Sequence, residues 1–198
     1  MKNVFAALTA SAILAFAANT QAVPVYSTAG TENPTTYSFT AAATGDIVAY
    51  FTGSTASYIN ELSLLVNGVY TGVIGLNNHS SSYGAQLNLG SVNAGDVLVF
   101  QLISLSPSGI GPWYSTQSMN SDGINHVYSA AYGGDKFVPA GTFVAFEDLP
   151  YGGDLNYNDE TFVFTNVATS SKAPEPASLA LLGLGLVSLV ASRRRKTG

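Results

Sequence analysis

Residues 143–164 read FVAFEDLPYGGDLNYNDETFVF, and this stretch decides the fold class. Two apolar runs rich in Phe and Val flank a segment of Pro, Gly, Asn and Asp, which are the residues that turns prefer. Short apolar runs bounded by such residues are typical of β-strands. The stretch therefore predicts two strands, over residues 141–146 and 160–167, joined by a polar, acidic loop.

The same pattern of short apolar runs and turn residues continues through the rest of the chain. Asn67-Gly68 separates two runs and predicts a two-residue hairpin, because both central residues of a type I′ turn need positive φ. Gly45-Asp46 and Gly95-Asp96 each precede an apolar strand, which suggests two related sheets. Almost nothing indicates a helix, so we expect an all-β domain, an antiparallel β-sandwich of jelly-roll type. The other expected strands cover residues 36–41, 47–52, 61–66, 69–74, 85–89, 97–104 and 126–131.

Oxygen-bearing side chains alternate in the acidic loop. Asp154, Asn156 and Asn158 match positions 1, 3 and 5 of an EF-hand-like loop, and calcium takes about six to eight oxygen ligands. Asp159 and Thr165 stand where an EF-hand has glycine and glutamate, so a calcium loop of another kind is expected. The alternative is a metal-free turn in which Asx side chains bond nearby backbone groups. The candidate calcium ligands are Glu147, Asp148, Asp154, Asn156, Asn158 and Asp159.

The loop also resembles a known domain type. Residues 146–148 read FED and residues 154–159 read DLNYND. This is similar to the hallmark of a domain of unknown function found in many exported bacterial proteins, a Phe-Glu-Asp strand end followed by a D-x-[DN]-Y-N-D turn. Members of that family are not tied to one activity, so the resemblance implies a domain type and no particular reaction.

The C-terminal residues form three blocks in a fixed order. Pro174, Glu175 and Pro176 come first, residues 177–192 carry no charge, and Arg193, Arg194, Arg195 and Lys196 end the apolar run. We expect residues 177–192 to form a transmembrane helix and residues 193–198 a basic cytoplasmic tail. The order closely resembles the PEP-CTERM sorting signal of exported bacterial proteins. That resemblance implies recognition by exosortase, a membrane sortase, and delivery to the cell surface or the extracellular matrix.

The N-terminus agrees with export. Lys2 precedes an apolar, alanine-rich run, and residues 20–22 resemble a small-residue cleavage site, so residues 1–22 are expected to be a signal peptide. The alternative is an uncleaved N-terminal anchor. Residues 23–168 then form the sandwich domain, and residues 169–176 form a linker that contains the Pro-Glu-Pro motif.

The composition of the exported part excludes several function classes. Between residues 23 and 171 there are eleven acids and one base, Lys136, which gives a net charge of about −10. Such a surface repels phosphate backbones, so nucleic-acid binding is excluded, and it attracts cations instead. The chain has no cysteine, which excludes disulfides and thiol chemistry.

An aromatic pair lies in the long segment 106–123. Trp113 and Tyr114 are candidate ligand-binding residues, because an aromatic face can stack on a sugar ring of an extracellular polysaccharide. The alternative is that Trp113 closes one end of the core.

Enzymatic sites find little support in the sequence. His79 and His126 have no metal-ligand spacing, and no G-x-S-x-G elbow is present. The acids of the loop could imitate the carboxylate pair of a glycoside hydrolase, but acids clustered at a polar turn should ionise and compete for a cation. We therefore expect a non-enzymatic, calcium-supported surface or matrix protein. A carbohydrate-binding module is the first alternative and a hydrolase the second.

Overall fold

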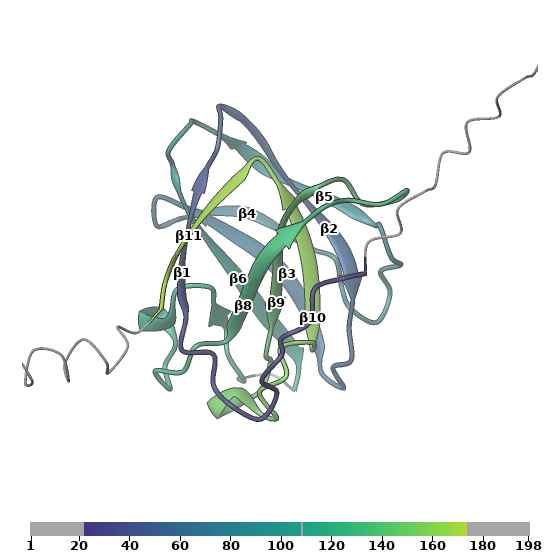
Figure 1. The fold of residues 1–198 in the computed structure, drawn as a ribbon, viewed down its shortest axis with the longest axis vertical. Helices are drawn as coiled ribbons and strands as arrows, with labels where there is room; N and C mark the ends of the chain where they lie inside the picture. Colours follow the sequence, from purple (N-terminus) through teal and green to yellow (C-terminus); the bar gives the residue numbers. More distant parts are fainter. Residues whose placement is uncertain (1–21, 108, 174–198) are drawn as a thin grey trace, which may run out of the picture.

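The structure, a computed structural model, describes residues 22–107 and 109–173. It is built from two antiparallel sheets that pack face to face (Figure 1). The six-stranded sheet has the order β11-β1-β6-β3-β4, with β7 paired to β6, and the five-stranded sheet has the order β5-β2-β10-β9-β8. The first sheet contains β1 (Thr36–Ala41), β3 (Ile59–Val66), β4 (Val69–Gly75), β6 (Val97–Ser106), β7 (Trp113–Tyr114) and β11 (Val167–Lys172). The second contains β2 (Gly45–Gly53), β5 (Gln86–Val92), β8 (Val127–Tyr132), β9 (Gly141–Phe146) and β10 (Glu160–Thr165).

All nine expected strands are present, and the all-β prediction is confirmed. The hairpin between β3 and β4 turns at Asn67 and Gly68, whose φ values of 51° and 80° are those that a type I′ turn needs. Gly45 and Asp46 are the first two residues of β2, whereas Gly95 and Asp96 form a turn before β6, and the two strands lie in different sheets. The chain crosses repeatedly from one sheet to the other, as it does in jelly-roll sandwiches.

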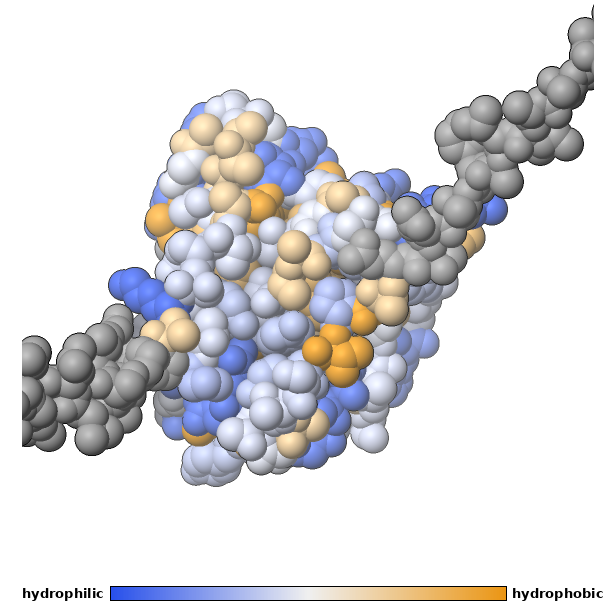
Figure 2. Space-filling model, in the orientation of Figure 1, coloured by the Kyte–Doolittle hydropathy of each residue, from blue (hydrophilic) through white to orange (hydrophobic). Residues whose placement is uncertain are grey.

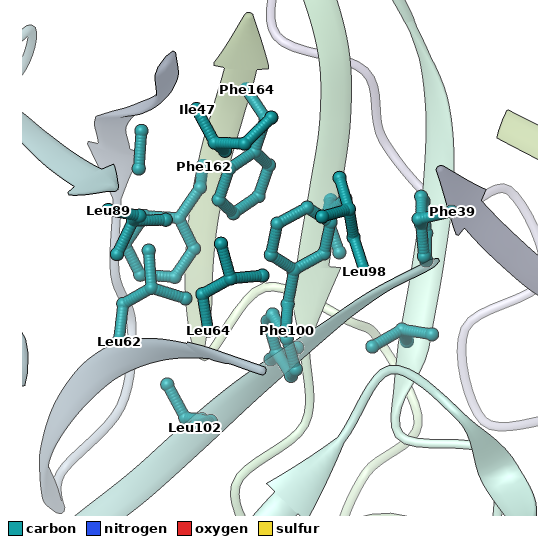
Figure 3. Packing of buried hydrophobic residues seen from close by; sticks show 14 of the residues in the cluster. Phe39, Ile47, Leu62, Leu64, Leu89, Leu98, Phe100, Leu102, Phe162 and Phe164 are labelled. Carbon is teal, nitrogen blue, oxygen red and sulfur yellow. The ribbon is translucent and has the colours of Figure 1, made fainter. Parts of the chain in front are cut away.

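The main core lies between the two sheets. It consists of alternating inward side chains, and the rings of Phe100 on β6 and Phe164 on β10 stack with centroids 3.8 Å apart (Figure 3). Full burial of large apolar side chains is the dominant stabilising term in a domain without disulfides. Members with no more than 2 % exposure include Phe39, Ile47, Leu62, Leu64, Leu89, Leu98, Phe100, Leu102, Phe162 and Phe164.

A second, smaller core covers the outer face of the five-stranded sheet. There Phe143 and Val163 pack with Tyr26 from the N-terminal segment and Tyr157 from the acidic loop. Strands β9 and β10 are therefore buried on both faces, which explains why their sequences are continuously apolar. On the molecular face shown in Figure 2, apolar residues are interspersed among polar ones.

Two strands were not expected. Strand β7 lies inside the segment 106–123, together with the 3₁₀ turn η1 (Gln117–Met119). Strand β11 pairs with β1 along its whole length, from Ala41 opposite Val167 to Thr36 opposite Lys172. The linker was expected to begin at residue 169, and this is wrong, because residues 169–172 belong to the sheet. Their exposed polar side chains gave no strand pattern, and backbone pairing holds them.

The expected signal peptide, apart from Ala22, lies outside the described residues, as do the Pro-Glu-Pro motif, the transmembrane helix and the basic tail. Among residues 22–107 and 109–173 there is no helix of the length and apolarity needed to cross a membrane.

Candidate functional site

The candidate site is the acidic loop of residues 147–159, which joins β9 to β10 and contains the 3₁₀ turn η2 (Pro150–Gly152). Its backbone is tightly wound: Tyr151, Leu155 and Tyr157 all have φ between 54° and 61°. Gly152 also has positive φ, and a Cβ atom there would come within 2.3 Å of a Leu155 methyl group. The N-terminal segment holds the loop in place, since the Gly30 amide donates to the carbonyls of Asp154 and Leu155 at 3.1 and 3.2 Å. These backbone conformations and hydrogen bonds define the course of the loop.

Glu147 and Asp148 continue β9, and their side chains contact opposite faces of the five-stranded sheet. Glu147 is fully buried beside the outer core, where its Oε1 accepts the amide of Tyr157 and its Oε2 has no partner. Asp148 faces the other sheet, where its Oδ2 accepts Asn60 Nδ2 at 2.7 Å. Consecutive residues in an extended chain point to opposite faces, so these two carboxylates do not converge.

Burial raises the pKa of both carboxyl groups. The pKa of Glu147 rises to about 8, with neighbouring Asp159 and Asp154 adding repulsion, against the hydrogen bond from Tyr157. The pKa of Asp148 rises to about 6 for the same reason, with Asp159 nearby, against the hydrogen bond from Asn60. Asp159 also accepts the Asp148 amide at 3.0 Å through Oδ2, so its side chain links the two ends of the loop.

The alternating side chains of the loop bond to one another and to its surroundings. Asn156 Nδ2 donates to Asp154 Oδ2 at 2.6 Å, and the Asn158 amide donates to Asn156 Oδ1 at 3.1 Å. Asn158 Oδ1 accepts the hydroxyl of Thr55. The bond from the Asn158 amide to Asn156 is that of an Asx turn, and the other two join side chains without a metal, so the arrangement is compatible with the metal-free alternative.

The structure thus gathers the expected ligands in one loop without directing them at one point. Within the described ranges, 22–107 and 109–173, no group of three or more Asp, Glu or His side chains is arranged to hold a metal ion. Calcium binding by this loop stays a prediction.

Glu160, the first residue of β10, is a member of the site that the sequence analysis missed. Its side chain is fully buried, and neither carboxylate oxygen has a hydrogen-bond partner. Burial raises its pKa well above the ordinary value, and the charges of Asp148, Glu61 and Asp159 raise it further. Strand alternation could have found it, because Glu160 lies in phase with the inward-facing Phe162 and Phe164.

Trp113 lies in the core, as in the alternative that the sequence analysis left open, and not where it could stack on a sugar. Its side chain is 2 % exposed and belongs to the main core. The indole Nε1 donates to the Asp148 carbonyl at 2.7 Å, and the ring stacks on His126 with centroids 3.9 Å apart and planes 8° apart. An indole enclosed in this way has no free face for a sugar. Tyr114, half-buried beside it, accepts a hydrogen bond from Gln101 at 3.0 Å.

His126 is buried beneath that indole. Its Nδ1 lies 2.9 Å from the Glu147 carbonyl oxygen and its Nε2 lies 3.0 Å from Asp122 Oδ2. Trp113 and His126 therefore both hold the backbone that begins the acidic loop, and their contacts are explained without a substrate.

Comparison with known families bears on the C-terminus. Residues 172–196 match the family model described as the PEP-CTERM protein-sorting motif. The chain carries a PEP-CTERM sorting motif. This confirms the expectation drawn from Pro174 to Arg195, and the motif implies export and processing by exosortase, a membrane enzyme. The resemblance of residues 146–159 to a domain of unknown function stays a prediction. No curated protein and no solved structure was found to match the chain.

Proposed function

We propose that this protein is a non-enzymatic structural or adhesive component of the cell surface or extracellular matrix, released or anchored there by exosortase. The observation that carries the proposal is the sorting motif, which follows the last strand of the domain directly. The acidic side chains Glu147, Asp148 and Glu160 are buried in the domain and are therefore not available on its surface for a substrate, which supports a structural role.

The burial of the acids argues against hydrolysis. A glycosidase needs two carboxyl groups that flank a substrate in a cleft. Glu147 and Glu160 are both fully buried, and Asp148 is 3 % exposed and accepts a hydrogen bond from Asn60. The enclosed position of Trp113 likewise removes the main support for a carbohydrate-binding module.

Processing in a host that encodes exosortase tests the proposal. Antibodies against the domain should detect it at the surface or in the medium, and intact-mass measurement should show a chain that begins at Val23 and lacks the basic tail. In an exosortase-deficient strain, and in a variant with alanine at residues 174–176, a longer chain should stay in the membrane fraction. A matched variant with alanine at residues 79, 80 and 82, exposed positions of a turn away from the motif, should be processed normally. Unchanged processing of the 174–176 variant would refute the sorting part.

Calcium is the second part of the proposal. The net charge of the domain and its buried, donor-poor carboxylates support a hard cation, which takes oxygen ligands with loose geometry. Glu147, Asp148 and Asp159 are the anionic members of the loop closest to the sandwich. Because a ligand that binds only the folded state stabilises it, the melting temperature should be higher with calcium than with chelator, and magnesium serves as the control. Equal melting temperatures would remove calcium from the proposal and leave the sorting part intact.

A further inference from the structure

Glu160 is a buried acid outside the acidic loop, and the contacts described so far do not explain its burial. Strand register places it opposite Phe146, the last residue of β9, and it shares the inward face of β10 with Phe162. Asp148 lies two residues beyond Phe146 and on the same inward side, since it reaches Asn60 of the opposite sheet. Two acids from neighbouring strands thus meet at one end of the space between the sheets.

The surroundings of these two acids are polar and tied to the other sheet. Asn60, fully buried at the start of β3, donates to Asp148 and accepts the hydroxyl of Ser104 on β6 at 2.7 Å. The backbone N–H of Asn60 donates to Asn78 Oδ1 at 2.9 Å. These groups supply neutral amide and hydroxyl oxygens within one or two hydrogen bonds of Asp148.

Glu160 is the member of this cluster that lacks a partner. Both of its oxygens are enclosed and accept no hydrogen bond. A charged carboxylate in that state is costly, and a proton on it would itself need an acceptor. A cation satisfies both oxygens at once, and the nearby carboxylate, amide and hydroxyl oxygens favour a hard ion such as calcium.

We propose that Glu160 and Asp148 form the anionic centre of a divalent-cation site, taken by calcium, which links the two sheets at the loop end of the sandwich. Two carboxylates together with amide, hydroxyl or water oxygens complete its shell, so the site does not require three converging acids. The inference rests on the proposed calcium binding. It places the ion between the two sheets, beside Asp148 and Glu160, and not in the Asp154–Asn158 turn. In a domain without disulfides, such an ion would bind residues of both sheets and stabilise their packing.

Thermal unfolding of the full chain in mild detergent, followed by the fluorescence of its single tryptophan, tests the site. With calcium at about 100-fold above its Kd, the melting temperature should rise by about 5–10 °C over chelator. Glu160→Gln should lose this rise and yet melt in chelator at or above the unchanged protein, because it removes a buried acid. The matched control Asp154→Asn, in the exposed turn, should keep the full rise.

The outcomes separate the two proposals. A full calcium rise in Glu160→Gln overturns this inference, and if Asp154→Asn loses the rise instead, calcium binds in the loop and the proposed function stands. No rise in the unchanged protein overturns this inference together with the calcium part of the proposed function, while the sorting part is unaffected.

Terbium supplies a second readout that does not depend on melting. Trp113 donates to the Asp148 carbonyl, so a terbium ion bound beside Asp148 should emit when the indole is excited. The emission should be lost in Glu160→Gln and in Asp148→Asn and retained in Asp154→Asn. Emission that survives in the first two variants overturns the site.

Discussion

Replacing Trp113 by phenylalanine is expected to destabilise the domain markedly, because the indole ties β7 to the start of the acidic loop. The variant removes the hydrogen bond to the Asp148 carbonyl and leaves that buried acceptor without a donor, which costs about 1–3 kcal/mol. The smaller ring also leaves a void and weakens the stack on His126, for about 1 kcal/mol more. The free energy of unfolding should therefore fall by about 2–4 kcal/mol.

Urea unfolding of the processed protein, followed by circular dichroism because the variant lacks tryptophan, measures this change. Tyr114→Phe is the matched control. It removes one hydroxyl from a half-buried neighbour that accepts a hydrogen bond from Gln101, and it should cost less than about 1 kcal/mol. The reasoning is refuted if Trp113→Phe is as stable as the unchanged protein. Full stability combined with loss of polysaccharide binding would restore the carbohydrate interpretation.

Three further predictions concern other parts of the fold. Phe164→Ala removes a fully buried ring stacked on Phe100 and should cost about 3–5 kcal/mol in the same urea assay; a loss below about 1 kcal/mol would contradict the packing described. Gly152→Ala should lower the melting temperature, since it places a methyl group against Leu155 at positive φ, and an unchanged value would mean that the loop can rewind. Hydrogen bonds lower the pKa of Asp135 to about 2, so its stabilising contribution is present above its unfolded pKa near 3.8 and is lost as the pH falls toward 2. Asp135→Asn should flatten that acid limb in unfolding measured against pH, and an unaltered limb would count against the assignment.

The sequence predicted the strands well where side chains alternate or run continuously apolar. It failed for β11, whose residues VATSSK carry no apolar pattern, because the ladder to β1 depends on a partner more than a hundred residues away. For a similar reason, the sequence left two interpretations of Trp113 open, sugar stacking and closure of the core. Nothing local shows that a two-residue strand will pair with β6 and turn the indole inward.

The sequence predicted where the acidic loop lies between two strands, but not how its side chains are oriented. The D-x-N-x-N spacing correctly marks a tight turn, while the direction of Glu147 and Asp148 follows from their alternation at the end of β9. Glu160 was predicted as the first residue of a strand but was not assigned to the site, although its phase with Phe162 already places it inside. Its burial is decided by the second sheet, which local patterning does not include.

Strand β11 ends at Lys172, so Ala173 is the only residue between the sheet and Pro174. The Pro-Glu-Pro motif therefore begins two residues after the last residue that pairs with β1. A sortase that binds the motif would therefore act on a segment only a few residues from the folded domain in the sequence. Cleavage after the motif would leave all six residue pairs between β1 and β11 intact, and the processed chain would then end a few residues after its last strand.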